Sequence, residues 1–216
     1  MNQHSPIPAF ARIRKARRAV EDRAEAHAVI DTALVAHVGF VAEGRPMVIP
    51  MAIARIGDTL YLHGASKTRI VQLADGAALC LTVTRIDGLV VARSGFNHSV
   101  NYACVMVHGT GRLVTGDEAD AALDAVVDHL LPGRTREIRA MSALERKATG
   151  VVAVEIKALT MKRRTGPPGD DPEDVAAGGW AGVMPVATVL GRPEPDAHSH
   201  DRAVPASLAA AKTKFG

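Results

Sequence analysis

Aromatic side chains are scarce in this chain of 216 residues, where they make up 3% of the sequence. Together with a hydrophobic content of 47%, this predicts a soluble globular protein whose core is built from Ala, Val, Leu and Ile. Cysteine is also rare. Cys80 and Cys104 each lie in an apolar run and lack CxxC spacing, so we expect buried free thiols. The length is sufficient for one substantial domain and does not require two.

Long apolar stretches are absent as well. No run approaches the ~20 residues of a transmembrane helix, and the N-terminus lacks the apolar region of a signal peptide. The net charge of +3 suits anionic ligands but is too small to indicate nucleic-acid binding. We therefore expect a cytoplasmic protein with neither a membrane nor a nucleic acid as partner. A dinucleotide-binding GxGxxG and a P-loop are likewise missing.

Residues 46–73 carry the most informative pattern. Gly57 and Asp58 separate two apolar runs, which predicts a tight turn between two strands. Successive side chains of the second strand face opposite sides. One side carries Leu60 and Leu62, and the other carries a more polar set: Thr59, Tyr61 and His63.

Ser66 follows as the predicted N-cap of a short helix over residues 67–74. The start of this helix offers free backbone N–H groups, hydroxyls and two cations, which are the groups that bind a phosphate dianion. They belong to four consecutive residues: Ser66, Lys67, Thr68 and Arg69. A solvated basic turn is the alternative interpretation of the same residues.

The rest of the chain predicts strands in hairpin order with interspersed helices. Helical periodicity covers residues 22–34 and 117–131, with Asp117 as a candidate cap, and Ser142 with Glu145 forms a capping box before a third helix. Two hairpin turns are expected, at residues 43–46 and at Asp87-Gly88. Further strands are expected at residues 77–86, 89–93, 102–114, 149–156 and 159–163. Gly109 and Gly111 predict a bulge or a close approach of backbone.

This pattern indicates a mainly β protein of the α+β class: an antiparallel barrel of about seven strands with helices packed on it. Four segments are expected along the chain. Residues 1–21 form a basic N-terminal arm, with residues 1–11 loose, and residues 22–165 form the barrel domain. Residues 166–191 form an extended segment that docks on the barrel or on a partner subunit, and residues 166–180 within it are expected to lack regular structure. Residues 192–216 form a mobile tail.

Three segments carry a resemblance to a known family. They read RPMVIPMAIARIGDTLYLHG at residues 45–64, LTVTRIDGLVVARSGFNHSVNY at residues 81–102, and RTGPPGDD followed by WAGVMP at residues 164–185. In this order they resemble the pyridoxamine 5′-phosphate oxidase-like FMN-binding split-barrel superfamily, and within it the small bacterial proteins related to nitroimidazole-resistance reductases. The resemblance covers about residues 12–190. It implies a six-stranded split barrel that forms a homodimer with FMN between the subunits.

The resemblance also implies which residues contact the cofactor. The strand under the isoalloxazine would be Val48, Ile49, Pro50, Met51, Ala52 and Ile53. The ribityl chain would lie along Tyr61, Leu62 and His63, and the phosphate would be held by Ser66, Lys67, Thr68 and Arg69. Asn101 and Tyr102 would come near the flavin, and Trp180 would cover it from the partner subunit. Many relatives continue Asn-Tyr-Arg-Ser-Val, where this chain has Ala103 and Cys104, so two hydrogen-bonding groups near the cofactor are lost.

The activity implied is an FMN-dependent oxidoreductase acting on a small molecule, in which the flavin carries the electrons. His63 is the candidate catalytic acid or base, and a purely structural hydrogen bond is its alternative role. His98 could line a substrate pocket or lie on the surface, His108 is expected to be structural, and the HxH of His198 and His200 is weak evidence for a metal. A haem-binding protein with a histidine axial ligand and a non-catalytic flavin carrier or sensor remain as alternatives. Pyridoxamine phosphate oxidation itself is disfavoured, because that enzyme carries basic residues for the substrate phosphate in its C-terminal segment, and residues 180–200 here contain a single one, Arg192.

Overall fold

A computed structural model of the chain describes residues 7–216. Within this range ten strands pair in antiparallel fashion: β1 Ala19–Val20, β2 Ala36–Ala42, β3 Arg45–Met51, β4 Ile53–Ile56, β5 Thr59–Ala65, β6 Ala78–Val91, β7 Ser99–Val114, β8 Thr149–Glu155, β9 Ala158–Arg164 and β10 Gly182–Pro185. The same residues form six α-helices: α1 Arg23–Asp31, α2 Arg69–Leu73, α3 Gly116–Leu130, α4 Ala143–Ala148, α5 Pro172–Ala177 and α6 Ala206–Phe215. The predicted class, antiparallel β with packed helices, is confirmed.

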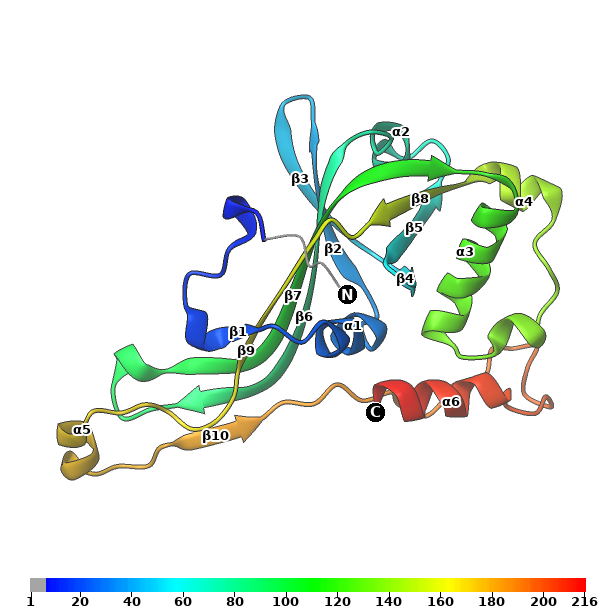
Figure 1. Ribbon diagram of the computed structural model, residues 1–216. Helices are drawn as coiled ribbons and strands as arrows, with labels where there is room; N and C mark the ends of the chain where they lie inside the picture. The colour runs from blue at the N-terminus through cyan, green and yellow to red at the C-terminus, as the bar shows by residue number, and fades with distance from the viewer. Residues whose placement is uncertain (1–6) are drawn as a thin grey trace.

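The strands follow the order β3-β2-β6-β7-β8-β5-β4, with β9 added to β7 and β10 added to β6. β7 passes from one part of the sheet to the other: Tyr102 to His108 pair with β9, and Gly111 to Val114 pair with β8. The inward side chains of this curved sheet form the main core, which includes Val38, Leu81 and Val105, each 1% exposed or less. Figure 1 shows the barrel in the centre, with α3 and α4 beside β8, β5 and β4.

The number of strands exceeds the prediction partly because residues 46–56 are two strands. β3 pairs with β2, and β4 pairs with β5, so the chain changes sheets at Ala52. The β2–β3 turn lies at Glu43 and Gly44, as expected, and both residues have positive φ angles, 52° and 71°. That geometry matches the twist of a two-residue hairpin.

The hairpin predicted at Asp87-Gly88 is wrong. β6 continues through these residues, with a bulge between Ile86 and Gly88. The turn signal is overridden by tertiary pairing, because β10 lies against this part of β6 and Gly88 pairs with Pro185. A Cβ on Gly88 would lie 2.8 Å from Val183 Cγ1 and 3.1 Å from Met184 O, so the glycine permits close approach of β10.

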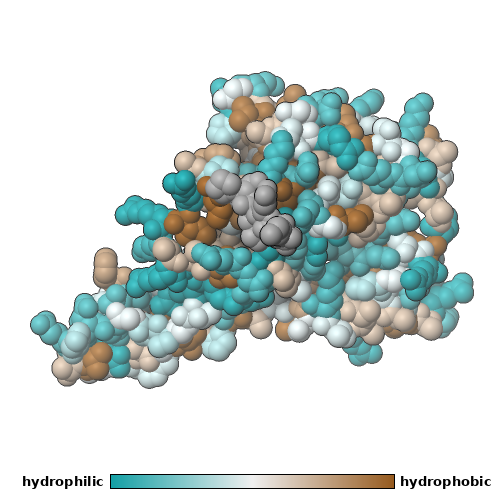
Figure 2. Space-filling view, in the orientation of Figure 1, coloured by the Kyte–Doolittle hydropathy of each residue, from teal (hydrophilic) through white to brown (hydrophobic). Residues whose placement is uncertain are grey.

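A projecting arm results from this pairing. We call residues 86–101 and 166–186 the arm; they comprise the outer parts of β6 and β7, then α5 and β10. Figure 1 shows the arm reaching away from the barrel, and Figure 2 shows it as a projection at the lower left with apolar side chains near its end. The expectation that residues 166–180 lack regular structure is therefore wrong for α5. The apolar stretch that follows, expected to dock, pairs with β6 as β10.

The C-terminal residues are also more ordered than predicted. In place of a mobile tail, residues 206–215 form α6, whose Ser207 and Ala211 are 2% and 1% exposed. Lys214 Nζ donates to the carbonyl oxygen of His129 in α3 at 2.5 Å. The sequence analysis did not predict α6, because the contacts that hold this helix come from residues far away in the sequence.

The N-terminal segment begins at Ile7 in the described residues, so the first six residues of the predicted basic arm lie outside them. Two short 3-10 turns, Ala9–Ala11 and Ala16–Arg18, precede β1, and β1 pairs with β9. Phe10 stacks edge-on against His108 with ring centroids 5.0 Å apart, which gives His108 the structural contact expected of it. These contacts attach residues 7–20 to the outer side of the barrel.

Several other sequence predictions are confirmed. Both hydrogen bonds of the Ser142 and Glu145 capping box are present at α4. Gly109 lies where a Cβ would come 2.3 Å from Glu155 O, and the same distance would separate a Cβ on Gly111 from Ala74 O.

The prediction that Asp117 caps α3 is wrong, because the helix begins at Gly116 and its N-cap is Thr115. No helix in residues 7–216 combines the length and apolar character needed to cross a membrane.

Candidate functional site

The ends of β3 and β5 meet the start of α2 at one place in the fold. Gly64 in β5 marks this meeting point. A Cβ added to Gly64 would lie 3.0 Å from Thr68 Oγ1 and 4.0 Å from Met51 Cε. The structure therefore brings together two groups of residues that the sequence placed at the cofactor, the strand at residues 48–53 and the turn at residues 66–69.

We call residues 66–69 the basic turn. The helix that follows is shorter than predicted, and its N-cap is Thr68 instead of Ser66. Ser66 N–H donates to Ala148 O at 2.8 Å and Thr68 N–H donates to Ala65 O at 2.8 Å, so two backbone donors expected to be free are already used. Among the described residues Lys67 N–H has no such partner, and the side chains of Lys67 and Arg69 are exposed without an ion-pair partner. These groups still offer two positive charges to an anion.

The strand predicted to lie under a flavin ring presents an open edge. β3 stands at the end of the strand order and pairs only with β2 among the described strands. Val48 is 65% exposed, and Pro50 is exposed on the same side of the sheet. Ile49 and Met51 face the core, and Ile53 is fully buried, so these side chains are structural. The unpaired backbone of β3 is the part that can reach a polar ring edge.

The predicted ribityl contacts divide into three different environments. Leu62 is 0% exposed in the main core, and Tyr61 is 8% exposed in a second cluster with Leu123 of α3, so neither side chain can lie along a ligand. Tyr61 Oη donates to Glu118 Oε1 at 3.0 Å; burial and this bond raise the pKa of Tyr61. His63 is the member of the trio that keeps a partly exposed side chain.

His63 has the unsatisfied imidazole expected at a functional position. Its Nδ1 is buried and makes no hydrogen bond within residues 7–216. Burial lowers the pKa of His63, so the neutral ring is favoured near pH 7. A neutral ring with a free nitrogen can accept a proton or a hydrogen bond.

Asn101, Tyr102 and Trp180 lie far from the basic turn within one chain. Val114, at one end of the 16-residue strand β7, pairs with Val151 of β8, and Val151 in turn pairs with His63 of β5. Asn101 lies near the other end of β7. A strand of that length spans about 50 Å. Trp180 is 71% exposed on the arm, which Figure 1 shows on the opposite side of the barrel from α2. The two halves of the predicted cofactor site are thus not brought together in a single chain.

Arg164 is a residue of this second half that the sequence analysis missed. Its guanidinium donates to Asn101 Oδ1 and to Gly166 O, and Asn101 Nδ2 also donates to Gly166 O at 3.1 Å. Ala103 is 0% exposed and faces the core, so an arginine at that position could not point outward without a change of strand register. The neighbouring strand β9 supplies a guanidinium beside Asn101 instead.

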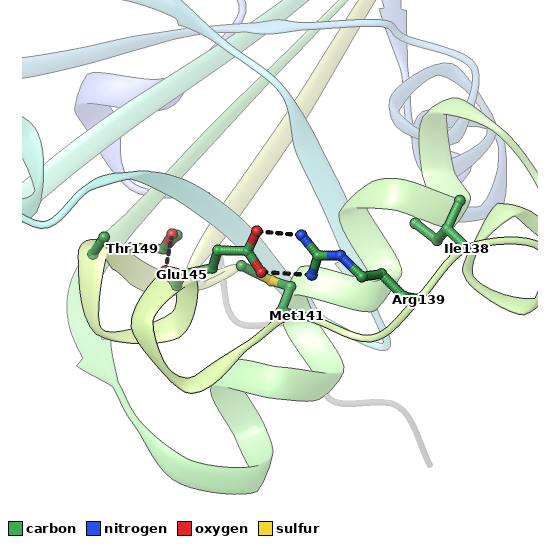
Figure 3. Close-up of a pocket in the computed structure, with 6 residues that line it drawn as sticks. Ile138, Arg139, Met141, Glu145 and Thr149 are labelled. Carbon is green, nitrogen blue, oxygen red and sulfur yellow. Dashed lines mark hydrogen bonds and ion pairs between the residues drawn. The ribbon is translucent and has the colours of Figure 1, made fainter. Parts of the chain in front are cut away.

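A groove of about 530 Å³ beside the basic turn was also not predicted. Figure 3 shows the residues that line it, with Arg139 and Glu145 joined by two hydrogen bonds. The full lining is Ile138, Arg139, Met141, Glu145, Ala148 and Thr149. Only the capping box of α4 was visible in the sequence, because the groove forms where α4 meets the end of β5.

Residues 7–216 contain no cluster of three His, Cys, Asp or Glu side chains that could hold a metal ion.

Comparison with known proteins identifies the fold and the family. The pyridoxamine 5′-phosphate oxidase family profile matches residues 22–163. The barrel thus defines a split-barrel protein of the flavin-binding type, as the resemblance predicted. This chain belongs to the pyridoxamine 5′-phosphate oxidase family.

Two solved structures resemble almost the whole chain. The FAD and heme binding protein from Mycobacterium smegmatis is 34% identical with a TM-score of 0.86, covering 90% of this chain and 97% of its own. The flavocytochrome Anf3 from Azotobacter vinelandii is 37% identical, also with a TM-score of 0.86, covering 92% and 94%. A candidate 5-nitroimidazole antibiotic resistance protein from Bacteroides thetaiotaomicron, 24% identical with a TM-score of 0.56, covers 67% and 85% and shares the fold. No curated protein matches the chain.

Proposed function

We propose that this chain is a flavin-binding redox protein that also carries haem. The observation that carries the proposal is the likeness, over 90% or more of the chain, to two proteins described as binding FAD and haem or as a flavocytochrome. The likeness extends beyond the 142-residue stretch, residues 22–163, that the family profile matches. It therefore includes at least part of the arm and the C-terminal region.

The basic turn and the edge of β3 fit a flavin. Lys67 and Arg69 supply positive charge for a phosphate, and the hydroxyl of Ser66 is exposed beside them. The unpaired backbone of β3 supplies donors and acceptors for the polar edge of the ring. When bound, the flavin provides one- or two-electron transfer, and the chain binds and orients it. Both FMN and FAD carry the phosphate that this turn would hold.

His98 fits the requirements of a haem ligand best among the exposed histidines. Its Nδ1 lies 2.8 Å from Ser94 O, so a proton on Nδ1 is held by that carbonyl and Nε2 is left free to coordinate a metal. Phe96, two residues away, is 94% exposed and offers an apolar surface for a porphyrin. A haem bound there would provide one-electron transfer. The sequence analysis considered His98 only as a pocket or surface residue.

We propose a homodimer, and the separation of the two halves of the predicted flavin site supports it. Asn101, Tyr102 and Trp180 can approach a basic turn only if that turn belongs to a second copy, because about 40 Å of β7, from Asn101 to Val114, lies between the halves in one chain. The exposed apolar side chains of the arm, including Trp180 and Met184 at 71% and 55%, are suited to burial against another subunit.

The role of His63 in turnover is proposed as hydrogen-bond or proton acceptance beside the flavin. The imidazole is partly exposed, and burial lowers its pKa, which favours a neutral ring able to accept a hydrogen bond at pH 7. We also propose that the substrate is a small molecule and that the protein resides in the cytoplasm.

Absorption spectroscopy of the purified protein tests the proposal. We expect flavin absorption bands close to those of free flavin, together with a Soret band from haem. His98→Ala is expected to remove the Soret band and keep the flavin bands, whereas the control His200→Ala keeps both. Bleaching of the flavin absorption by NAD(P)H would identify an oxidoreductase. If NAD(P)H causes no bleaching, the protein is a flavin carrier. A preparation that binds neither cofactor when reconstituted would refute the proposed function.

A further inference from the structure

Residues 12–18, which we call the cationic segment, carry five positive charges and no negative charge. The cations are Arg12, Arg14, Lys15, Arg17 and Arg18. Their number exceeds the net charge of the whole chain, +3, so the rest of the protein is net negative. Four of the five side chains are exposed, and that of Arg18 is half-buried. The excess positive charge of this protein is therefore concentrated in one short, accessible segment.

The cations of this segment have no internal partners. None of them forms an ion pair within residues 7–216, whereas nine arginines elsewhere in that range are each paired with a carboxylate of the same chain. An external anion that approaches the segment therefore meets charges that no nearby carboxylate neutralises.

The strand β9 holds the cationic segment beside the second half of the predicted cofactor site. β1 follows the segment directly, with Ala19 opposite Lys162 of β9. Lys162 also has no ion-pair partner among the described residues, so it extends the positive surface onto the barrel. Two residues further along β9, Arg164 donates to Asn101. Only about 7 Å of strand separates Lys162 from Arg164.

The pictures place this surface on one side of the molecule. Figure 1 shows residues 7–20 between the β2–β3 hairpin and the arm, and Figure 2 shows hydrophilic side chains gathered above the arm on the same side. The positive charge ends at Glu21 and Asp22, which follow the segment. The surface is thus a local patch, and not a belt around the protein.

We propose that the cationic segment and Lys162 form the docking surface for a small acidic electron-transfer protein. This inference rests on the proposed redox function, which needs a source of electrons. In each encounter the reduced carrier loses one electron to a cofactor of this chain and leaves oxidised. Two encounters, with two protons from water, supply what the full reduction of one flavin requires. Electron-transfer encounters bury little area and are steered by charge, and a patch of solvated cations suits such a contact.

The position of the patch favours an electron carrier over other polyanions. A carrier has to dock close to the cofactor that it reduces, and Lys162 lies next to the strand residues that reach Asn101. A membrane surface or a nucleic acid would be attracted by the same charges, but neither needs that proximity. The observations therefore support an acidic redox protein as the partner.

Isothermal titration of the full-length, flavin-loaded protein tests the proposal. The probe is oxidised plant-type [2Fe–2S] ferredoxin, an acidic one-electron carrier, and basic cytochrome c is the control of opposite charge. We expect ferredoxin to bind at least about tenfold more tightly than cytochrome c. Its affinity should fall at least about tenfold when the NaCl concentration is raised from about 0.05 to about 0.3 M, because salt screens exposed charges.

Charge reversal within the patch provides the decisive variant. Arg14→Glu, Lys15→Glu and Arg17→Glu together should weaken ferredoxin binding about tenfold or more and leave the flavin absorption of the purified protein unchanged. The corresponding triple glutamine variant removes the charges without reversing them and should show a smaller loss in the same direction. Circular dichroism and melting temperature establish that both variants are folded.

A second triple variant separates the patch from the overall charge. Arg136→Glu, Lys147→Glu and Lys212→Glu together make the same change in net charge at exposed positions without ion pairs among the described residues. Figure 1 shows α4 and α6, which carry Lys147 and Lys212, on the other side of the barrel from residues 7–20. This variant should bind ferredoxin within about twofold of wild type.

Cross-linking provides a readout independent of affinity. A carbodiimide joins lysine amines directly to carboxylates that lie in contact. Mass spectrometry of the product with ferredoxin should locate the links at Lys15 and Lys162. Links distributed equally to Lys147 and Lys212 would contradict a defined docking surface.

The outcomes distinguish this proposal from the proposed function. If neither ferredoxin nor an acidic flavodoxin binds, or if both charge-reversed variants lose affinity equally, the docking surface is overturned and flavin binding stands. Tighter binding of phosphatidylglycerol vesicles or duplex DNA than of either carrier would assign the segment to another polyanion and would also overturn it. A protein that takes up no flavin would instead remove the proposed function.

Discussion

The hydroxyl of Ser207 in α6 donates to Glu137 Oε2 over 2.6 Å, and the Ser207 backbone N–H donates to Oε1 of the same carboxylate at 3.2 Å. Ser207 is 2% exposed. These two bonds join the C-terminal helix to the segment that follows α3, and they explain why residues 206–215 are helical in a chain whose composition predicts a mobile tail.

Ser207→Ala should therefore loosen the C-terminal helix. We expect the free energy of unfolding to fall by about 1 kcal/mol, since a buried hydrogen bond is lost. Chemical denaturation measures this loss, and limited proteolysis should show faster cleavage near residue 205. Thr188→Ala, at an exposed position, is the control. Unchanged proteolysis of the Ser207 variant would contradict the docking of α6.

Gly109→Ala should destabilise the barrel. A Cβ at residue 109 would lie 2.3 Å from Glu155 O and 2.7 Å from Val154 Cγ1, and the backbone oxygen cannot move without disturbing the end of β8. The expected loss is about 1–3 kcal/mol, as for overpacked cores. Gly95→Ala is the comparison, because nothing lies within 4 Å of a Cβ there. Equal midpoints of urea unfolding for both variants would count against the close approach.

The stability of the protein should depend on pH through His63. Burial lowers its pKa in the folded state from the ordinary value of about 6.5, so the unfolded chain takes up a proton first as the pH falls. The free energy of unfolding is unaffected above pH 6.5 and decreases as the pH drops from 6.5 through the folded pKa. His63→Gln should lose less stability between pH 7.5 and 5.5 than wild type in urea unfolding. The exposed His200→Gln should behave like wild type.

Arg69→Ala tests the basic turn. We expect flavin binding to weaken by about 1.5–3 kcal/mol, the scale of a charged hydrogen bond. Isothermal titration of cofactor-free protein measures the change, with Arg45→Ala at the exposed β2–β3 turn as the control. Unchanged affinity would show that the phosphate lies elsewhere.

Trp180 provides a probe of the proposed dimer, because it is the single tryptophan of the chain. Flavin binding should quench its fluorescence in the dimer, where a partner's arm can reach the site. Dilution to monomer should restore the emission and release the flavin together, since the arm and the basic turn of one chain lie on opposite sides of the barrel (Figure 1). Flavin retained at full affinity by a demonstrated monomer would exclude a shared site.

Local chemistry accounts for most of what the sequence predicted. The alternation of Leu60 and Leu62 against Tyr61 and His63 needs only the two-residue period of a strand, and the capping box at Ser142 needs only one helix turn. Asp87-Gly88 failed as a turn because β10, far along the chain, pairs with the same stretch of β6. The groove at Arg139 and the support of Asn101 by Arg164 likewise depend on contacts between segments distant in sequence.

The pairing of Gly88 with Pro185 also sets the order in which the molecule can assemble. Barrel strands β2 to β9 are complete once residue 164 has been synthesised, but the outer part of β6 must wait for a strand from near the end of the chain. A nascent polypeptide therefore exposes that edge until late in translation. The arm, and with it any subunit contact that it makes, is expected to fold after the barrel.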